Sequence, residues 1–400
     1  MGTVYKTAES VCMGHPDKLC DLIADSILDA CLAQDRLARV ACEVLATKGH
    51  IIVAGEITCQ KMPSIKGVVR RVLEKVGYKP QRFRIKVLVH RQSPDIAGGV
   101  SQSLEARSGS RERYSLLGAG DQGTVYGYAV AESGHHMLPL PIVLAHRITA
   151  QLDKARRDGL IKGILPDGKA QVTVAYQDGV PKRIKTVVVS VQHEDSKSLD
   201  LLKEQIRSDV LWPAFDIFPL DQHTEVLVNP SGRFVEGGPA ADTGLTGRKL
   251  MVDTYGGLAL HGGGALSGKD PTKVDRSGAY LARYIAKHVV WAGLAQECQV
   301  AISYAIGKAD PVAFDLDTFH TGKVPDALLT QAALAVFNLR PAAIIEQLSL
   351  RKVRYVETAN YGHFHNIQFP WEATDQCVAL REAVRRLNIQ HEEQEEYTKP

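Results

Sequence analysis

Residues 261–276 read HGGGALSGKDPTKVDR and stand at the start of a long helical pattern that runs from Asp275 to Leu294. The stretch contains four glycines, two lysines and two aspartates. Glycine leaves backbone N–H groups accessible, and the start of a helix adds positive potential. These properties together predict a site that binds an anion.

The same stretch comes close to a P-loop, the G-x-x-x-x-G-K-[S/T] motif that binds nucleotide phosphates. Gly263 to Lys269 fits the first seven positions, but Asp270 replaces the Ser or Thr that binds Mg²⁺ at the eighth. Pro271 favours a helix start over a continuous P-loop helix. A glycine-rich turn is the alternative. Two lysines and a carboxylate at helical spacing favour a phosphate site that is not a standard P-loop.

The composition is that of an ordinary soluble globular protein, with 400 residues, 44% hydrophobic and 23% charged. This length predicts two to four domains. A net charge of +3 does not suggest nucleic-acid binding, and no apolar run or signal-peptide pattern suggests a membrane. The seven cysteines form no C-x-x-C pair, and their odd number predicts reduced thiols in a cytoplasmic protein without a zinc site.

A helix, a hairpin and a second helix follow one another three times along the chain. The expected hairpins and strand pairs lie at 39–47 with 50–58, 171–177 with 182–192, and 298–306 with 314–320. The expected helices lie at 16–32, 63–76, 141–158, 198–211, 275–294 and 326–339, with further strands at 83–90, 125–130 and 224–228. The pattern predicts an α+β fold of three related units, each a β-sheet with helices on one face.

We place the domain boundaries at 1–106, 107–229 and 230–378, followed by a tail at 379–400 whose end, 391–397, is expected to be solvated and frayed. Residues 91–120 show no periodicity, and a loop of this length is usually functional or disordered. A surface insertion is the alternative to a mobile lid. The flanking sequences QSPDI (92–96) and GAGDQG (118–123) favour the lid.

A second glycine-rich region at 229–249 ends in the cations Arg248 and Lys249, and Lys169 ends the sequence PDGK (166–169). Each would be an ordinary turn by itself. Together with Lys269 and Lys273 they supply the cations that a polyphosphate needs, and a polyphosphate is expected to bring Mg²⁺.

Carboxylates near helix starts are the expected Mg²⁺ ligands, with Asp17 and Asp275 the best candidates and Asp121 a third, although each could simply cap a helix. Glu43 and Glu56 lie inside apolar strands. If buried, they need a partner such as a monovalent cation or a substrate ammonium; if exposed, they need none. His15 could donate to a phosphate oxygen or to a leaving oxygen, and a loop histidine without a role is the alternative.

Four motifs resemble those of S-adenosylmethionine synthetases, also called methionine adenosyltransferases. They are GHPDK (14–18), GAGDQG (118–123), GGGALSGKDPTKVDRS (262–277) and GHF with FPWE (362–372). The similarity runs from about residue 7 to residue 375. The resemblance implies three pseudo-symmetric α+β domains. It also implies a homodimer or a dimer of dimers (homotetramer) with active sites at the subunit interface.

The implied activity is S-adenosylmethionine synthesis from ATP and L-methionine. The methionine sulfur attacks C5′ of the ribose and displaces triphosphate, which the enzyme then hydrolyses to pyrophosphate and phosphate. Mg²⁺, with two ions per site, and K⁺ are the implied cofactors. Little covalent help is needed for such chemistry, because sulfur is already nucleophilic, but a departing polyanion needs positioning and charge stabilisation.

The resemblance also implies roles for individual residues. The implied catalytic residues are His15, Lys169, Lys269 and Asp275. The implied ATP contacts are His15, Asp121, Asp167, Gly168, Lys169, Arg233, Phe234, Asp242, Arg248, Lys249, Ala265 and Lys269. The implied methionine contacts are Glu56, Gln92, Asp242 and Lys273. The implied metal ligands are Asp17 and Asp275 for Mg²⁺ and Glu43 for K⁺.

Two departures from the family pattern stand out. Cys12-Met13 precedes GHPDK where Ser or Gly followed by Glu is common, which removes a charge beside the site, and the loop from Gln92 to Gly118 is long and basic. Two other functions compete with the synthetase. An ATP-dependent phosphotransferase or ligase would yield ADP or an acyl-adenylate. A catalytically inactive regulatory subunit would be expected to lack one of His15, Asp17, Lys169, Lys269 and Asp275, all of which are present.

Overall fold

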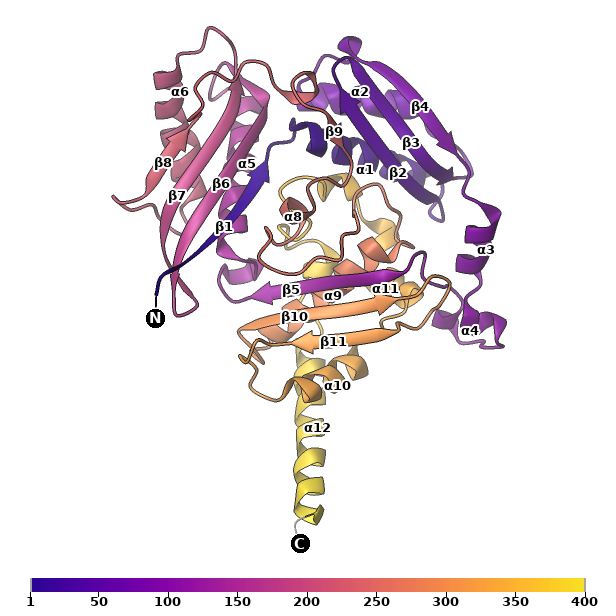
Figure 1. The fold of residues 1–400 in the computed structure, drawn as a ribbon. Helices are drawn as coiled ribbons and strands as arrows, with labels where there is room; N and C mark the ends of the chain where they lie inside the picture. Colours follow the sequence, from indigo (N-terminus) through magenta and orange to yellow (C-terminus); the bar gives the residue numbers. More distant parts are fainter. Residues whose placement is uncertain (1, 399–400) are drawn as a thin grey trace.

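The computed structural model describes residues 2–398, without the side chains of 94–97 and 391–398. Three β-sheets surround a centre that holds the short helix α8 (Leu250–Asp253) and long connecting segments (Figure 1). Helices pack against one face of each sheet. The expected α+β class with three sheet-and-helix units is therefore confirmed.

The first sheet has the strand order β4-β3-β2-β9. The expected hairpin is present as β2 (Arg39–Thr47) and β3 (His50–Thr58), while β4 (Arg84–His90) runs parallel to β3. Helices α1 (Pro16–Gln34) and α2 (Ile65–Val76) pack together on its covered face. The even-numbered residues of β2 from 40 to 46 are all apolar and are buried on this face, because successive side chains of a strand point to opposite faces.

The second sheet has the order β1-β6-β7-β8, with β1 at Val4–Val11, β6 at Ile164–Gln177, β7 at Val180–His193 and β8 at Glu225–Val228. Helix α5 (Leu140–Arg157) packs on β1 and β6. The single helix expected at 198–211 is instead α6 (Leu199–Gln205), a π-helical stretch at 206–211 and α7 (Trp212–Ala214). The wider turn brings Ile206, Val210 and Leu211 into the core together.

The third sheet has the order β11-β10-β5, with β5 at Gly123–Val130, β10 at Glu297–Tyr304 and β11 at Ala313–Asp317. Helix α9 (Val274–Trp291) covers β5 and β10, and α10 (Asp326–Val336) covers β11. Helix α11 (Pro341–Gln347) contacts α9. Helix α12 (Cys377–Thr398) contacts α9 and α10 and then projects away from the sheets (Figure 1). Its backbone stays helical through 391–397, where a frayed tail was expected; the side chains there lie outside the described ones.

Each sheet also takes a strand from a distant part of the chain. The N-terminal β1 pairs with β6, β5 pairs with β10, and the two-residue β9 (Gly244–Leu245) pairs with β2. The three units are thus tied together by shared strands. The boundaries at 106, 229 and 378 stay a prediction.

The expectation of a loop without secondary structure at 91–120 is wrong. The segment contains α3 (Pro94–Ser101), α4 (Leu104–Arg107) and a 3₁₀ turn at Arg113–Ser115. Its order comes from distant partners. The Glu105 carboxylate accepts the amides of Ala309 and Asp310 at 2.8 and 3.2 Å, and Arg113 pairs with Glu346 at 2.6 Å. Local periodicity cannot reveal such contacts. Whether the segment moves as a lid stays a prediction.

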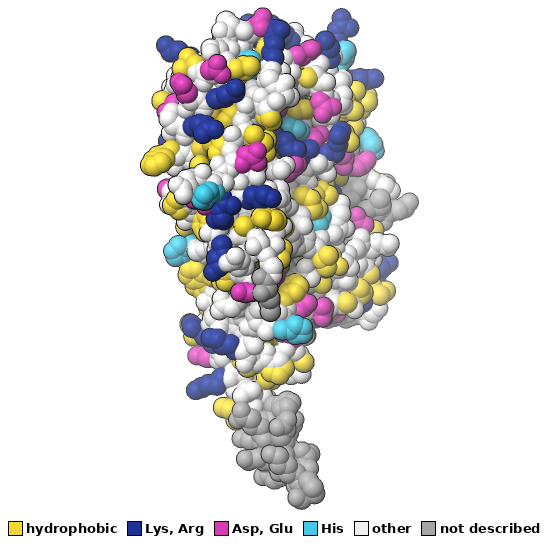
Figure 2. All heavy atoms as spheres, turned by 60° about the vertical axis from the view of Figure 1, so that its left-hand side comes forward, with side chains coloured by type: hydrophobic (Ala, Val, Ile, Leu, Met, Phe, Trp, Pro, Cys, Tyr) yellow, Lys and Arg dark blue, Asp and Glu magenta, His cyan; other side chains and the backbone are white. Residues whose placement is uncertain are grey.

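Charged side chains of both signs are interspersed over the face shown in Figure 2. Among the described residues, no single helix is long and apolar enough to cross a membrane; α10 and α11, bent by 74° relative to each other, reach that length and composition only as a pair.

His146 is a buried histidine that joins β1 to α5. Its Nδ1 lies 2.8 Å from the hydroxyl of Ser10, and a Cβ on Gly362 would lie 2.7 Å from its Nε2. Burial lowers the pKa of His146 well below its ordinary 6.5, and the nearby charges of His365 and Lys18 act in the same direction. The folded protein therefore keeps this ring neutral at a pH where the unfolded chain protonates it.

We expect His146→Gln to weaken the acid sensitivity of the fold. Below pH 6.5, His146 binds a proton in the unfolded chain but not in the folded protein. The free energy of unfolding therefore falls as the pH falls below 6.5. One such histidine contributes up to about 1.4 kcal/mol per pH unit. We expect urea denaturation to show that the free energy of unfolding falls less between about pH 7.5 and pH 5.5 in the variant than in the unchanged protein. Exposed His223→Gln is the control, and equal losses in all three proteins would refute the assignment.

Candidate functional site

Helix α1 presents a row of carboxylates on one face. Residues four apart on a helix share a face, and here these are Asp17, Asp21, Asp25 and Asp29. They accept backbone N–H groups from later parts of the chain, in the same order along the helix. The donors, at 2.8–3.0 Å, are Leu245, Gly247, Gly268, Tyr355 and Val356. The row therefore positions both glycine-rich regions over α1.

The two glycine-rich regions lie one after the other along the same edge of β2. Residues 268–270 pair with residues 40–42, through the bonds Cys42 N–H to Gly268 O and Asp270 N–H to Val40 O, both 3.0 Å. Farther along, β9 pairs with Leu45 and Ala46. This arrangement brings the cations of both regions to one sheet edge.

Lys269 projects from the open face of the sheet and pairs with Asp275 at the start of α9. The distance between Nζ and Oδ2 is 2.5 Å, and the two side chains are only 20% and 17% exposed. Gly264 lies against the same carboxylate, because a Cβ there would come within 2.3 Å of Asp275 Oδ1. Two groups predicted to act together are thus in contact, and the glycine allows the close approach.

A fully buried ion pair between Arg276 and Asp25 holds the backbone at Lys269. The guanidinium of Arg276 donates two hydrogen bonds to Asp25, both 2.8 Å, and a third to the carbonyl of Lys269 at 3.0 Å. Asp25 also accepts the amide of Gly268 at 2.8 Å. Gly268 has φ +82°, and a Cβ there would lie 2.1 Å from the carbonyl of Cys42. The pair therefore fixes the backbone on either side of Gly268 and Lys269.

The P-loop comparison fails for a physical reason. Lys269 pairs with Ala41 of β2, whereas a P-loop lysine lies at the start of its helix, and α9 begins only at Val274. The buried Asp270 stands where a P-loop has its Mg²⁺-binding hydroxyl, and its carboxylate is occupied by hydrogen bonds within the protein. It accepts from Val40 N–H at 2.8 Å, Thr272 Oγ1 at 2.7 Å and Lys273 Nζ at 2.6 Å. Lys273, an expected methionine contact, thus faces this aspartate.

His15 and Asp17 form the second charged centre, at the start of α1. Lys249 donates to Asp17 at 2.6 Å, and Arg248 lies 3.6 Å from it. Burial alone would raise the pKa of Asp17, but the bonds from Lys249 and from the amide of Leu245 lower it below its usual value. Asp17 is therefore a carboxylate anion surrounded by cations.

His15 is neutral in this environment. Burial, followed by the charge of Lys249, lowers its pKa to about 4. Its Nδ1 accepts the amide of Asp17 at 3.2 Å, which leaves the proton on Nε2. The ring can thus donate one hydrogen bond from Nε2 without carrying a charge.

A buried lysine, Lys18, follows Asp17 in α1 and links two buried aspartates. The ammonium of Lys18 contacts Asp21 at 2.8 Å and also binds Asp253. Burial alone would lower the pKa of Lys18, but the charges of these two aspartates raise it. Burial raises the pKa of Asp21 to about 7.

The sequence PDGK brings three expected ATP residues beside β1. The Lys169 ammonium pairs with Glu9 at 2.5 Å, and the carbonyl of Gly168 accepts the amide of Cys12 at 2.9 Å. Asp167 accepts the amide of Gly238 at 2.8 Å, and burial raises its pKa to about 6. These contacts join the second sheet to the glycine-rich region after β8.

Glu43 and Glu56 lie on the open face of the first sheet, the same face as Lys269. Glu43 is largely exposed, and its pKa is raised by partial burial and by the charge of Glu56. Glu56 is half-buried and lies 3.1 Å from Nε2 of His90. In the single chain this face is open, so neither carboxylate is forced to bind a cation.

Most of the other expected site residues lie at the surface or bond elsewhere in the described structure. Asp121 and Asp242 are exposed, and Gln92 is half-exposed. Arg233 pairs with Asp195, and the backbone of Phe234 bonds with His193. Ala265 touches the Lys249 region, since a Cβ on Gly247 would lie 2.6 Å from it. The roles of all these residues stay predictions.

Cys12 and Met13, which depart from the family pattern, are both buried, and both donate hydrogen bonds from their backbone amides. Cys12 bonds with Gly168, and the amide of Met13 donates to Asp153 at 2.9 Å. Burial raises the pKa of the Cys12 thiol well above its ordinary value. The two residues thus hold the segment before His15 through their backbone amides.

The donor chemistry fits the metals that the resemblance implies. Asp17 and Asp275 are carboxylates that already contact a cationic ammonium, and Mg²⁺ usually takes one or two carboxylates together with phosphate oxygens and water. A monovalent cation near Glu43 would relieve its repulsion with Glu56. Among the described residues, no group of three or more His, Cys, Asp or Glu side chains forms a ready-made metal site.

We expect Gly264→Ala to lower kcat/KM by at least about 100-fold, because the new methyl group displaces the Asp275 carboxylate and a shift of about 1 Å has that effect. Gly263→Ala is the matched control: Gly263 has φ +87°, but a Cβ there meets nothing within 4 Å. The control should lose stability through backbone strain and keep more activity. Steady-state kinetics and melting temperatures test this, and equal activity losses in both variants would refute it.

Several residues of the site were not predicted. These are the buried groups Lys18, Asp21, Asp25 and Arg276, with Glu9 and His90 at the surface. The four-residue spacing of aspartates in an otherwise apolar helix is a signal that could have revealed the carboxylate row. No local signal marks Glu9 or His90.

Comparisons with known proteins agree over nearly the whole chain. Family models for the N-terminal, central and C-terminal domains of S-adenosylmethionine synthetase match residues 3–94, 116–234 and 236–373. S-adenosylmethionine synthase from Thermus thermophilus is 52% identical over 384 residues, covering 94% of this chain and 97% of the relative. The enzyme of the same name from Desulforudis audaxviator is 48% identical over 386 residues, covering 94% and 98%. That from Staphylococcus epidermidis is 48% identical over 389 residues, covering 94% and 97%.

Proposed function

Because the chain belongs to the S-adenosylmethionine synthetase family, we propose that it joins ATP and L-methionine into S-adenosylmethionine. The methionine sulfur attacks C5′ of the ribose, the C5′–O bond breaks, and triphosphate leaves with the bonding electrons. Hydrolysis of the triphosphate to pyrophosphate and phosphate follows. One observation carries the proposal: both glycine-rich regions lie along the same edge of β2, with Lys249 and Lys269 among their cations.

Each charged centre has a role in this reaction. His15 donates its Nε2 proton as a hydrogen bond to the oxygen that leaves C5′, and its neutral state lets it do so without fixing a charge there. Lys269 and Lys169 stabilise the charge that builds on the triphosphate. Arg248 and Lys249 hold the phosphates, and Asp275 positions Lys269. No general base is needed because the sulfur is already a nucleophile.

Two Mg²⁺ ions would be held by Asp17 and Asp275, and K⁺ by Glu43. When bound, Mg²⁺ neutralises charge on the phosphates. The residues proposed to contact methionine are Glu56, Gln92, Asp242 and Lys273. The remaining ATP contacts are proposed to be Asp121, Asp167, Gly168, Arg233, Phe234 and Ala265.

The open face of the first sheet supports a homodimer with the site at its interface. Besides Glu43 and Glu56, this face carries the half-exposed apolar side chains of Leu45, Ile52 and Ala54. A second copy over this face would bury them and complete the surroundings of Lys269. A dimer of dimers extends the same proposal. The seven cysteines are free thiols, which supports a cytoplasmic location.

Product analysis tests the proposal against the alternatives. With ATP and methionine, chromatography should show S-adenosylmethionine, pyrophosphate and phosphate in equal amounts, and omission of methionine should stop S-adenosylmethionine formation. ADP or an acyl-adenylate as the product would instead assign a phosphotransferase or ligase. A chain that binds ATP without forming any product would be a regulatory subunit.

A further inference from the structure

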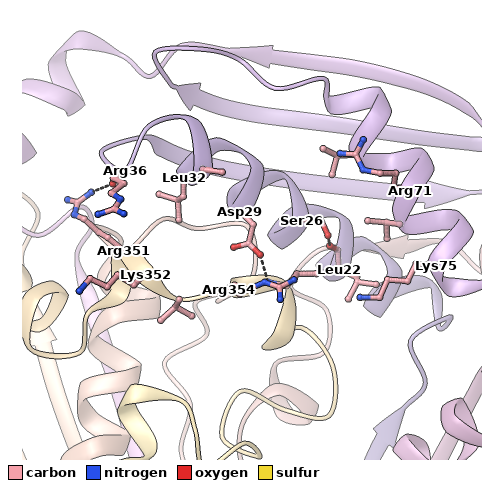
Figure 3. Close-up of a pocket in the computed structure, with 15 residues that line it drawn as sticks. Leu22, Ser26, Asp29, Leu32, Arg36, Arg71, Lys75, Arg351, Lys352 and Arg354 are labelled. Carbon is pink, nitrogen blue, oxygen red and sulfur yellow. Dashed lines mark hydrogen bonds between the residues drawn. The ribbon is translucent and has the colours of Figure 1, made fainter.

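A groove of about 640 Å³ lies between α1, α2 and residues 351–356, at the end of the α1 carboxylate row, and none of the proposed ATP, methionine or metal ligands lines it. Figure 3 shows side chains from the three segments converging on it. Arg36, Arg351 and Lys352 lie at one end and Arg71 and Lys75 at the other. Pockets of about 300–1,000 Å³ are typical sites for small molecules. We call it the cationic groove.

Positive charge dominates the lining of the cationic groove. Six cations line it, namely Arg36, Arg71, Lys75, Arg351, Lys352 and Arg354. Asp29 is the one carboxylate among the lining residues, and it already accepts the amides of Tyr355 and Val356 at 2.8 and 2.9 Å. In the described part of the chain, Arg354 alone of the six has a carboxylate partner within ion-pair distance, Glu357 at 3.0 Å.

This shortage of partners contrasts with the buried cations of the protein. The buried cations Lys18, Arg276 and Arg283 each contact at least one carboxylate. In the groove, Arg351 instead donates to the backbone carbonyl of Arg36 at 2.5 Å. Partial burial, followed by the charge of Arg39, lowers the pKa of Arg351. The groove therefore offers several cations without a carboxylate partner among the described residues, and a bound anion would supply one.

The floor of the groove strengthens its attraction for anions. Its apolar lining consists of Leu22, Leu32, Ala33, Val68, Val72, Val353 and Val356. A cleft with walls of low dielectric and charges of one sign focuses the electric field and raises the local concentration of counter-ions. Guanidinium groups also match the geometry of phosphate oxygens.

We propose that the cationic groove binds a small anion that carries several phosphate charges, either inorganic or on a nucleotide. The volume of the groove and the spread of cations over three segments fit a compact polyanion. The site is separate from the proposed catalytic centre, and the proposal does not depend on the proposed function.

Calorimetric titration of the full-length protein tests this proposal, with inorganic tripolyphosphate and ATP as separate probes and without methionine. Two classes of sites per chain are expected. Arg71→Ala/Lys75→Ala should weaken the groove class at least about tenfold and leave turnover unchanged. Lys66→Ala/Arg70→Ala is the matched control, because it removes the same charge from exposed positions of α2 that do not line the groove. Lys269→Met should weaken binding only at the second class of sites, in the proposed catalytic centre.

Binding of both probes at the groove would identify phosphate as the shared chemistry, and binding of one alone would identify the source as inorganic or nucleotide. Anion binding that Arg71→Ala/Lys75→Ala leaves unchanged would overturn the proposal, whether the unchanged protein shows one class of sites or two. Equal losses of affinity in the two double variants would also overturn it, because they would show that only the net charge of the protein matters. Binding of an RNA oligonucleotide in place of both small anions would assign the cations to a macromolecular surface and would also overturn it.

Discussion

Lys269→Met should lower kcat by about 10²–10³-fold, the usual effect of removing one group that stabilises charge in a transition state. The KM for methionine should change much less. Lys269 lies at the junction of β2 and the glycine-rich stretch, is largely buried, and has the Asp275 carboxylate as its neighbour. In the proposed reaction its charge matters most as the triphosphate departs, so we expect the loss to fall on kcat.

Two further variants sharpen this prediction. Lys269→Arg keeps the charge and should recover part of the activity. Lys203→Met removes a lysine from the exposed face of α6 and should have no effect. Steady-state kinetics with ATP and methionine varied separately will separate kcat from KM. An unchanged kcat in Lys269→Met, or a loss confined to KM, would remove this residue from the catalytic group.

Arg276→Met should destabilise the protein by about 3–5 kcal/mol, because it leaves the Asp25 carboxylate buried without a counter-charge. The guanidinium has no exposed surface and makes two hydrogen bonds to that carboxylate. Asp25→Asn/Arg276→Met should be more stable than Arg276→Met alone, since the neutral amide needs no counter-charge and can still accept from Gly268. Urea denaturation of the three proteins provides the comparison.

An exposed pair that also makes two hydrogen bonds provides the control for Arg276→Met. Arg183 also makes two hydrogen bonds to a carboxylate, that of Asp221, at 2.8 and 3.0 Å, but it lies at the surface. Arg183→Met should therefore leave the unfolding midpoint nearly unchanged. Arg276→Met should also lower kcat in its folded fraction, because the backbone of Lys269 loses a hydrogen bond. Similar stability losses at the two sites would contradict the role of burial.

The elements that sequence analysis predicted well are those set by local patterns. The hairpin of β2 and β3 has the predicted bounds, and the turn between β6 and β7 lies where Asp178-Gly179 predicted it, because alternation around a tight turn determines both strands. Strand β6 begins at Ile164, earlier than expected, and β10 and β11 pair across a longer connection. Helix α2 ends at Gly77 in the left-handed conformation, as its pattern predicted. The motifs also pointed to Lys269 and Asp275, which the structure brings into contact.

The features that escaped prediction depend on partners far along the chain. Asp25 meets Arg276 from 251 positions away, and Asp17 meets Lys249 from 232. Helix α4 owes its placement to the amides of Ala309 and Asp310. The two-residue β9 has no pattern of its own and exists only because β2 offers an edge. Period and propensity describe neighbours in sequence, so they carry no information about such contacts.

The carboxylate row of α1 explains why the glycine-rich regions can serve one site. Each region approaches the helix through glycine amides that its aspartates accept, at Gly247 and Gly268. Beside Gly268, Lys269 faces the open side of the sheet, whereas Arg248 and Lys249, beside Gly247, approach Asp17 at the start of α1. The stretch at 261–276 is thus held by its backbone, and its resemblance to a P-loop is limited to sequence.

Transfer of the ribose carbon tests the central claim most directly. ATP labelled with ¹³C at C5′ is incubated with methionine and the protein, and the label is followed by NMR. If the two glycine-rich regions hold triphosphate as a leaving group, the labelled carbon will appear bonded to the sulfonium sulfur of S-adenosylmethionine. A label that stays bonded to oxygen, in ADP or AMP, while ATP is consumed would contradict the account.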